Sequence, residues 1–236
     1  MSERVVWVTG ASTGIGFEIA KAFSKAGDIV VATARRKSRL VTLVNEIRFA
    51  GREAYAFVCN VQSERSIVST KKKIIEKCGT IDVIINNAGV TVFRSFLDTK
   101  SYEFDELMAT NLRGGFLMAK AVLPVFIKKR KGQIINILSV AAHSRFTDSA
   151  IYSASKAAMM SMFNVLREEV RKFNVKITNI YPGPVDTAMW DPRARTRFRR
   201  RMMTPKDIAD IVLNASNQPK KVVIEDVIIK PMKGDI

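Results

Sequence analysis

The sequence of 236 residues contains little cysteine, a single histidine and no long apolar segment. Its two cysteines, Cys59 and Cys78, exclude a secreted scaffold that depends on many disulfides. The one histidine, His143, leaves too few soft ligands for a transition-metal site, so we expect none. The apolar runs are far shorter than the roughly 20 residues that cross a bilayer. Residues 1–8 lack the pattern of a signal peptide, and we therefore expect a soluble cytoplasmic protein without a membrane partner.

Acidic residues are scarce relative to basic ones. The chain has 22 Asp and Glu against 39 Lys and Arg, which gives a formal net charge of +17 at pH 7. Such an excess attracts phosphates and anionic surfaces but does not specify a fold. It leaves open the alternative of a basic nucleic-acid-binding protein. No zinc-finger, homeodomain or other recognition motif accompanies the charge, so we expect no specific nucleic-acid partner.

Apolar segments of strand length alternate with segments of helical periodicity along the chain. No linker rich in proline, glycine or serine interrupts this alternation, which indicates parallel strands joined by right-handed crossovers. We therefore expect one α/β domain over residues 1–236. It would be a doubly wound, Rossmann-like sheet of about seven parallel strands with helices on both faces. The expected strands are 4–8, 28–34, 54–59, 81–86, 133–139, 175–181 and 221–229, and the expected helices are 15–26, 38–50, 63–77, 102–129, 151–173 and 205–217.

A glycine-rich turn, TGASTGIG at residues 9–16, separates the first expected strand from the first helix. Glycines at such a place allow a tight turn and let a pyrophosphate approach the backbone closely. The start of the helix then offers free N–H groups and a positive dipole to the phosphates. The turn predicts a dinucleotide site that uses Gly10, Ser12, Thr13, Gly14, Ile15 and Gly16.

The same turn also matches the nucleophile elbow of serine hydrolases, with Ser12 between Gly10 and Gly14. His143 would then be the base. Only nine residues precede the turn, so no upstream loop remains to supply a second oxyanion donor. We do not favour this alternative.

Six motifs occur in one order on the expected elements: the turn at 9–16, Asn86-Asn87-Ala88-Gly89, Asn111, Ser139, Tyr152-x-x-x-Lys156 and Pro182-Gly183. On these motifs the sequence resembles the short-chain dehydrogenase/reductase family over essentially its whole length. The resemblance implies an oxidoreductase that transfers hydride between NADP(H) and a secondary alcohol or carbonyl compound, with hydroxy acids and keto acids among the candidates. It also implies a homodimer or homotetramer in which the two long helices, 102–129 and 151–173, form the dimer surface.

The candidate catalytic residues are Ser139, Tyr152, Lys156 and Asn111. Tyr152 and Lys156 lie four residues apart on an expected helix, so they share one face. An ammonium about 5 Å from a phenolic oxygen favours phenolate by roughly 3 kcal/mol, or about two pK units. We therefore expect the pKa of Tyr152 to fall toward neutrality, where a general acid/base is effective. Ser139, at the carboxyl edge of the sheet, is placed to donate to a substrate carbonyl.

The resemblance gives each of these residues a role. Tyr152 would transfer the proton, Lys156 would also hold the nicotinamide ribose, and Asn111 would support a water relay. A regulator that senses a dinucleotide without turnover would need no proton donor. The intact set therefore favours an enzyme over that alternative.

Further cofactor contacts are implied by the resemblance. After the third strand the family usually has Asp-Val, whereas this chain has Asn60-Val61; an amide oxygen still accepts from the adenine amino group. Thr187 would bond the carboxamide of the nicotinamide, or else cap a helix. Asparagine side chains near the fourth strand would also tie neighbouring strands together. The cofactor-binding residues implied are Asn60, Val61, Asn87, Ala88, Gly89, Tyr152, Lys156, Pro182, Gly183, Val185 and Thr187.

The end of the second strand predicts which dinucleotide binds. An NAD enzyme usually has an acidic residue there for the ribose hydroxyl. Here the strand ends in Arg35 and Arg36, and the nearest carboxylate, Asp28, lies at the other end of the strand, about 20 Å away. Arginine forms strong charge-assisted hydrogen bonds with phosphate. We expect NADP(H) to be preferred over NAD(H).

Residues 188–204 interrupt the regular pattern and are expected to form an irregular lid over the substrate. Trp190 would contact the substrate together with Ser139 and Tyr152, and Met189 and Phe198 would complete the wall. The arginines of the insertion leave two alternatives open: a solvated flap, or a clamp for a carboxylate or phosphate on an anionic substrate. They are Arg193, Arg195, Arg197, Arg199, Arg200 and Arg201.

Overall fold

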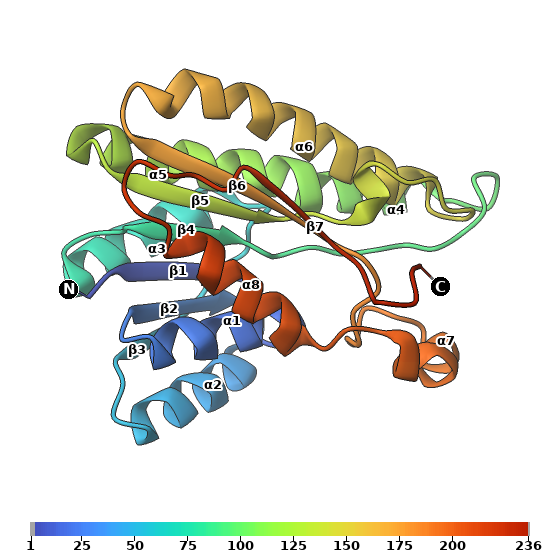
Figure 1. The fold of residues 1–236 in the computed structure, drawn as a ribbon, viewed down its shortest axis with the longest axis horizontal. Helices are drawn as coiled ribbons and strands as arrows, with labels where there is room; N and C mark the ends of the chain where they lie inside the picture. Colours follow the sequence, from blue (N-terminus) through green and yellow to red (C-terminus); the bar gives the residue numbers. More distant parts are fainter. Residues whose placement is uncertain (1–2, 236) are drawn as a thin grey trace.

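Seven strands form one parallel sheet in the order β3-β2-β1-β4-β5-β6-β7 in the computed structural model, which describes residues 3–235 (Figure 1). The expected fold class is thereby confirmed. The strands are β1 (Val5–Thr9), β2 (Ile29–Ala34), β3 (Ala54–Val58), β4 (Val83–Asn86), β5 (Gly132–Ile137), β6 (Val175–Pro182) and β7 (Asp226–Ile229). The helices are α1 (Gly14–Lys25), α2 (Lys37–Phe49), α3 (Glu64–Cys78), α4 (Ser101–Met108), α5 (Gly114–Lys129), α6 (Ala150–Arg171), α7 (Pro192–Phe198) and α8 (Pro205–Ser216).

Two apolar layers hold helices against the two faces of the sheet. One layer contains buried side chains of α1, α2 and α8, and the other contains buried side chains of α3, α5 and α6 (Figure 1). Strand side chains alternate between these layers: Val6 and Val8 belong to the first, and Val5 and Trp7 belong to the second. Because both faces are covered, the carboxyl edge of the sheet remains as the place for a ligand.

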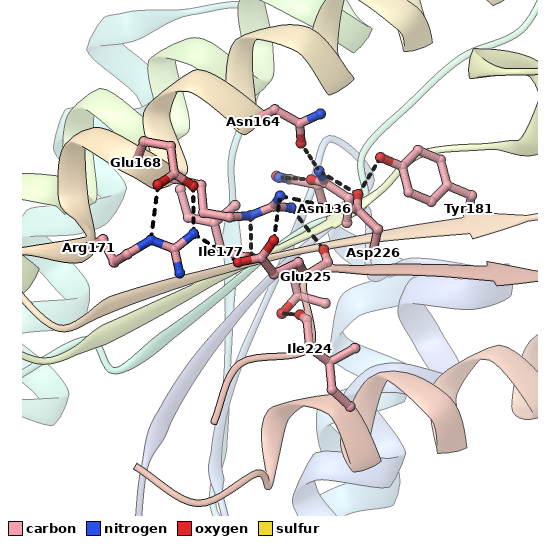
Figure 2. A network of polar contacts seen from close by, with 12 residues as sticks. Asn136, Asn164, Glu168, Arg171, Ile177, Tyr181, Ile224, Glu225 and Asp226 are labelled. Atoms are coloured by element: carbon pink, nitrogen blue, oxygen red, sulfur yellow. Dashed lines mark hydrogen bonds and ion pairs between the residues drawn. The ribbon is translucent and has the colours of Figure 1, made fainter. Parts of the chain in front are cut away.

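A row of polar side chains runs across four neighbouring strands. Asn86, Asn136, Asn179 and Asp226 are register partners on β4 to β7. Each amide donates to the next one, from Asn86 to Asn136 and from Asn136 to Asn179, both at 2.9 Å. At the outer end Tyr181 donates to Asp226 at 2.6 Å (Figure 2). A shift of register would leave buried amides unpaired, so the row holds the strands in this alignment and confirms the expected tie between strands.

The expected helix over 102–129 is interrupted. A π-helical segment, η1 (Ala109–Arg113), separates α4 from α5. Asn111 lies in this segment, and π-helical turns inside helices are often found at functional sites. Helical periodicity in the sequence does not distinguish such a turn from a regular one.

The last expected strand, 221–229, begins only at Asp226. Upstream of it, three backbone carbonyls turn toward the ammonium of Lys176 and accept from it, those of Gln218, Pro219 and Val222, at 3.2, 2.7 and 2.5 Å. Carbonyls that are occupied in this way do not pair with a neighbouring strand.

The insertion at 188–204 is not irregular, as the sequence suggested, but largely helical. Asp191 accepts from the N–H groups of Arg193 and Ala194, and Pro192 follows it at the first helical position, so α7 begins with a cap and a preset φ. A short 3-10 helix, η3 (Arg199–Arg201), follows. In Figure 1, α7 lies at the end of the molecule away from the N-terminus. No helix within residues 3–235 has the length and apolar character needed to cross a membrane.

Candidate active site

A cavity of about 730 Å³ runs along the carboxyl ends of the strands. It is formed by the glycine turn after β1, the ends of β2 and β3, the loop after β4 and the turn after β6. Its size lies within the range of ligand sites. The residues that line it are Gly10, Ser12, Thr13, Gly14, Ile15, Thr33, Ala34, Arg35, Arg36, Cys59, Asn60, Val61, Gln62, Asn87, Ala88, Gly89, Val90, Thr91, Thr110, Thr187, Ala188 and Met189.

The glycine turn is locked to the loop after β4. The side-chain amide of Asn87 donates to the carbonyl of Thr9 at 2.9 Å. Gly10 has a φ of +66°, and a Cβ there would lie 2.9 Å from the backbone of Ala88. A Cβ at Gly16 would lie 2.3 Å from the Asn87 amide. Only glycine therefore permits this close approach of α1 to the sheet.

The residues present fit a dinucleotide. The turn presents backbone and the start of α1 to the middle of the cavity, as a pyrophosphate requires. Gly14 lies opposite Thr187. The methyl group of Thr187 would be 3.3 Å from a Cβ at Gly14, so a larger residue at this position would narrow the cavity. Gly89 leaves room beside Lys156 in the same way. Arginines lie at one end of the cavity and Thr187 at the other.

Most of the residues expected to hold the cofactor line the cavity, but six do not: Tyr152 and Lys156, which are described below, and four that lie behind the cavity wall. Gly16 packs against Asn87 behind the turn. The N–H of Gly183 donates to Ile229 of β7 at 2.7 Å, and Val185 forms a bridge with Met203. The structure therefore places Gly16, Pro182, Gly183 and Val185 in the support of the cavity and outside its lining.

The structure bears on the expected roles of Thr187 and Asn60. Thr187 lines the cavity, whereas the cap of α7 is Asp191. Asn60 lies at the cavity with its side-chain oxygen accepting from the N–H of Gln62 at 3.1 Å. Its amide group consequently supports the loop after β3 as well as facing the cavity.

Arg35 and Arg36 both line one end of the cavity, and Arg36 reaches back to the hydroxyl of Ser12 at 3.4 Å. This contact decides against the serine-hydrolase alternative. The partner of Ser12 is Arg36, whereas the ring of His143 packs against Tyr181 with centroids 4.6 Å apart.

Ser139, Tyr152 and Lys156 come together as expected. Tyr152 and Lys156 share a face of α6, with the ammonium 5.7 Å from the centre of the tyrosine ring, and they are 8% and 6% exposed. Lys156 donates to the carbonyl of Ile137 at 3.0 Å. The hydroxyl of Ser139 accepts from the N–H of Ala141 at 3.1 Å and also hydrogen-bonds Tyr152. The phenol and the ammonium are buried, and the partly exposed hydroxyl of Ser139 lies beside them, so three groups capable of acid–base chemistry meet here.

The pKa values of this centre differ from the sequence-based expectation. Burial raises the pKa of Tyr152 above its ordinary value, and the hydrogen bond with Ser139 works in the opposite direction. Burial lowers the pKa of Lys156 to about 8. The lysine is itself desolvated and bonded to a carbonyl, so in this structure it does not bring the phenol toward neutrality. Tyr152 is therefore protonated at neutral pH, which is the state that donates.

Asn111 is buried in η1 and is fully engaged with its neighbours. Its amide donates to the carbonyl of Val90 at 2.9 Å and to Ser155 at 3.1 Å, and its oxygen accepts from the N–H of Val90 at 2.9 Å. The side chain thus holds the loop after β4 against the catalytic helix. Its expected part in a proton relay stays a prediction.

Two functional features were missed in the sequence. Phe93, in the loop after β4, packs between Tyr152 and Trp190, with ring centroids 5.9 Å from each. Asp186 accepts from Arg195 and Arg199 of the insertion. The position of Phe93 just after Asn87-Ala88-Gly89, at the same sheet edge as Ser139, is the signal that could have indicated it.

The chain is similar to known proteins over nearly its whole length. Residues 4–197 match the family model of the short chain dehydrogenases. A sepiapterin reductase of Chlorobaculum tepidum is 33% identical to this chain over 99% of the chain and 98% of its own length. An uncharacterized oxidoreductase of Staphylococcus haemolyticus is also 33% identical, over 98% and 99%.

Solved structures give the same result. A metagenomic short-chain oxidoreductase in complex with NADP superimposes with a TM-score of 0.86 at 32% identity, covering 97% of both chains. The closed form of a serine dehydrogenase complexed with NADP+ superimposes with a TM-score of 0.92 at 28% identity, covering 98% of this chain and 96% of its own. None of these relatives favours nucleic-acid binding or sensing without turnover. This chain belongs to the short-chain dehydrogenase/reductase family of oxidoreductases.

Proposed function

We propose that the protein is an NADP(H)-dependent oxidoreductase that interconverts a secondary alcohol and the corresponding carbonyl compound, with Tyr152 as the general acid/base. The observation that carries this proposal is the meeting of Ser139 with the buried side chains of Tyr152 and Lys156 at the carboxyl edge of the sheet. It lies beside a cavity that fits a dinucleotide. When bound, the nicotinamide cofactor supplies or accepts the hydride.

In the direction of reduction, Tyr152 donates its phenolic proton to the carbonyl oxygen of the substrate as negative charge develops there. Its raised pKa keeps this proton in place at neutral pH. The hydroxyl of Ser139 accepts from Ala141 and has one proton of its own, which is directed to Tyr152 in this structure and would be donated to the carbonyl oxygen when a substrate is bound. In the direction of oxidation Tyr152 must lose its proton first.

Lys156 and Asn111 support this centre. With a pKa of about 8, Lys156 exchanges protons close to neutral pH, and from its place beside Gly89 it would also hold the nicotinamide ribose. Asn111 holds Val90, and through it the loop that borders the substrate.

The test is NADPH oxidation followed by its absorbance with a panel of aldehydes, ketones and keto acids. The panel includes sepiapterin, because that substrate is named for the Chlorobaculum tepidum relative. Turnover of at least one carbonyl compound is expected. Tight NADPH binding with no turnover of any of them would favour the sensing alternative.

The preference for NADP(H) rests on Arg35 and Arg36, which line the end of the cavity where β2 stops. Arg35→Asp is expected to lower kcat/KM for NADPH about tenfold or more and to improve the relative use of NADH. A single charge-assisted hydrogen bond to the phosphate contributes roughly 1.5–3 kcal/mol. Both cofactors are titrated against one carbonyl substrate.

Arg39→Ala is the matched control, because Arg39 is exposed on α2 and does not line the cavity. Unchanged constants for NADPH and NADH in Arg35→Asp would place the phosphate site elsewhere.

A homodimer or homotetramer is proposed through the outer faces of α5 and α6. Phe116 on α5 is 47% exposed, and Val165 on α6 is 60% exposed, and exposed apolar side chains on neighbouring helices mark contact surfaces. Light scattering at micromolar concentration is expected to give a dimer or larger, and Val165→Glu is expected to shift it toward a monomer.

Phe49→Glu serves as the control, because Phe49 is 96% exposed at the end of α2, on the other side of the sheet. A monomeric unmodified protein would contradict the assembly.

A further inference from the structure

The loop after β3 borders the cavity beside Arg35 and Arg36. The N–H of Cys59 donates to the carbonyl of Ala34 at the end of β2, at 3.1 Å, so the ends of the two strands lie side by side. Residues 59–62 line the cavity at this place. Because the arginines are proposed to bind the ribose phosphate, the base attached to that ribose would lie against these residues.

The side chain of Asn60 is held in one orientation. Its oxygen accepts from the N–H of Gln62 at 3.1 Å, and its backbone N–H donates to the hydroxyl of Ser66, also at 3.1 Å. Its backbone carbonyl accepts from the N–H of Ser63 at 3.1 Å. An N–H group bonds to the oxygen of a side-chain amide and not to its NH₂ group, so the contact with Gln62 distinguishes the two ends of the amide. The NH₂ group therefore lies on the side away from Gln62.

This NH₂ group is the part of Asn60 that remains to be bonded. No acceptor for it lies within hydrogen-bond distance among residues 3–235, and the half-buried side chain lines the cavity. We expected from the sequence that the amide oxygen accepts from the amino group of adenine, but in the structure that oxygen is bonded to Gln62. The group that Asn60 offers to a base is consequently a donor.

A donor at this position does not match the amino group of adenine. That amino group is itself a donor, whereas the ring nitrogens of adenine accept, and a 6-oxopurine has an accepting oxygen where adenine has the amine. Two donors cannot bond to each other. Among the described residues that line the cavity there is also no aspartate or glutamate that could accept from the amine.

Resting on the function proposed above, we propose that Asn60 contacts the base of the cofactor as a hydrogen-bond donor, so that the site does not require the amino group of adenine. The chain then binds the hypoxanthine analogue of NADP+ about as well as it binds NADP+. The aspartate that is usual in the family at this position would accept from the amine and would repel the 6-oxygen of hypoxanthine.

The test is isothermal titration calorimetry of the protein with NADP+ and with nicotinamide hypoxanthine dinucleotide phosphate. The two Kd values are expected to agree within about threefold, because neither base gains a bond that the other lacks. In Asn60→Asp, the ratio of the two Kd values is expected to shift about tenfold or more in favour of NADP+, the effect of one charge-assisted hydrogen bond to the amine. Aspartate keeps an oxygen for the N–H of Gln62, so the loop retains its turn.

Ser63→Asp is the matched control. Ser63 caps α3 by accepting from the N–H of Ser66, a role that aspartate also fills, and it does not line the cavity. This substitution adds the same negative charge to the same loop. Both Kd values are therefore expected to change by the same factor, and their ratio is expected to stay as in the unmodified protein.

Two outcomes would overturn the donor role of Asn60. One is a Kd for NADP+ that is at least about tenfold lower than the Kd for the hypoxanthine analogue in the unmodified protein. If that preference disappeared in Gln62→Leu, the side chain of Gln62 would be the group that accepts from the amine. The other is an unchanged ratio in Asn60→Asp, which would show that the residue does not touch the base.

The calorimetric ratio does not depend on turnover, so the two proposals fail separately. Equal binding of both dinucleotides without turnover of any carbonyl compound would support the donor role of Asn60 and contradict the proposed function. Turnover of a carbonyl compound together with a strong preference for the adenine cofactor would support the proposed function and contradict the donor role. Binding of neither dinucleotide would overturn both.

Discussion

Replacing Tyr152 by phenylalanine is expected to lower kcat at least about 100-fold, the factor that general acid catalysis supplies. The phenylalanine ring keeps the packing of α6 against Phe93 but has no proton to give to the substrate oxygen. The Kd for NADPH is expected to stay within a few fold, because the ring beside the cofactor remains. Single-turnover kinetics for kcat and a fluorescence titration for Kd measure the two quantities separately.

Tyr102→Phe is the control for this experiment. Tyr102 is 68% exposed on α4, so this substitution removes the same phenolic hydroxyl at the surface. A Tyr152→Phe variant that retains more than about a tenth of the original kcat would contradict the assignment of Tyr152 as proton donor.

Replacing Ser139 by alanine is expected to lower kcat by about 100- to 1,000-fold, the effect of losing one donor to a developing oxyanion. Two contacts are lost together: the donor to the substrate oxygen, and the hydrogen bond that lowers the pKa of Tyr152. The pKa of Tyr152 should therefore rise further in the variant. The pH profile of alcohol oxidation, which needs the deprotonated phenol, is expected to shift to higher pH.

Ser144→Ala is the control, because Ser144 lies in the same loop but is not one of the groups proposed to transfer the proton. A loss of kcat in Ser139→Ala without any shift in the pH profile would indicate that Ser139 acts on the substrate alone. A kcat that is unchanged would remove Ser139 from the site.

The pKa values of Tyr152 and Lys156 cannot be inferred from the sequence spacing of this pair alone. The spacing of Tyr152 and Lys156 correctly predicts that they share a face of α6. It does not predict that the ammonium is buried and bonded to the Ile137 carbonyl, which depends on how β5 meets α6. Desolvation then raises the pKa of the phenol and lowers that of the lysine, opposite to what the isolated pair suggests.

The fold itself was predictable in outline because its signals are local. Alternating apolar strands and amphipathic helices indicate a parallel sheet, and the cap of α7 at Asp191-Pro192 is a local signal of the same kind. The ends of elements depended on distant partners. Lys176 on β6 binds the carbonyl of Val222, which lies within the expected last strand, and the chain around Asn111 adopts a π-helical turn that periodicity does not reveal.

By itself, the sequence determined the class of the sheet, the glycine turn after the first strand, and the identity of the groups at the carboxyl edge. Each of these follows from local conformational limits or from residues on one element. The tertiary structure decided which groups meet across elements. It placed Phe93 from the loop after β4 against Trp190 from the turn after β6, and it gave Asp186 the arginines that the sequence offered to a substrate. The first of these contacts joins segments that are far apart in the sequence, so it depends on how the elements pack. The second joins residues close in sequence, but a pattern of charges does not reveal which carboxylate each arginine binds.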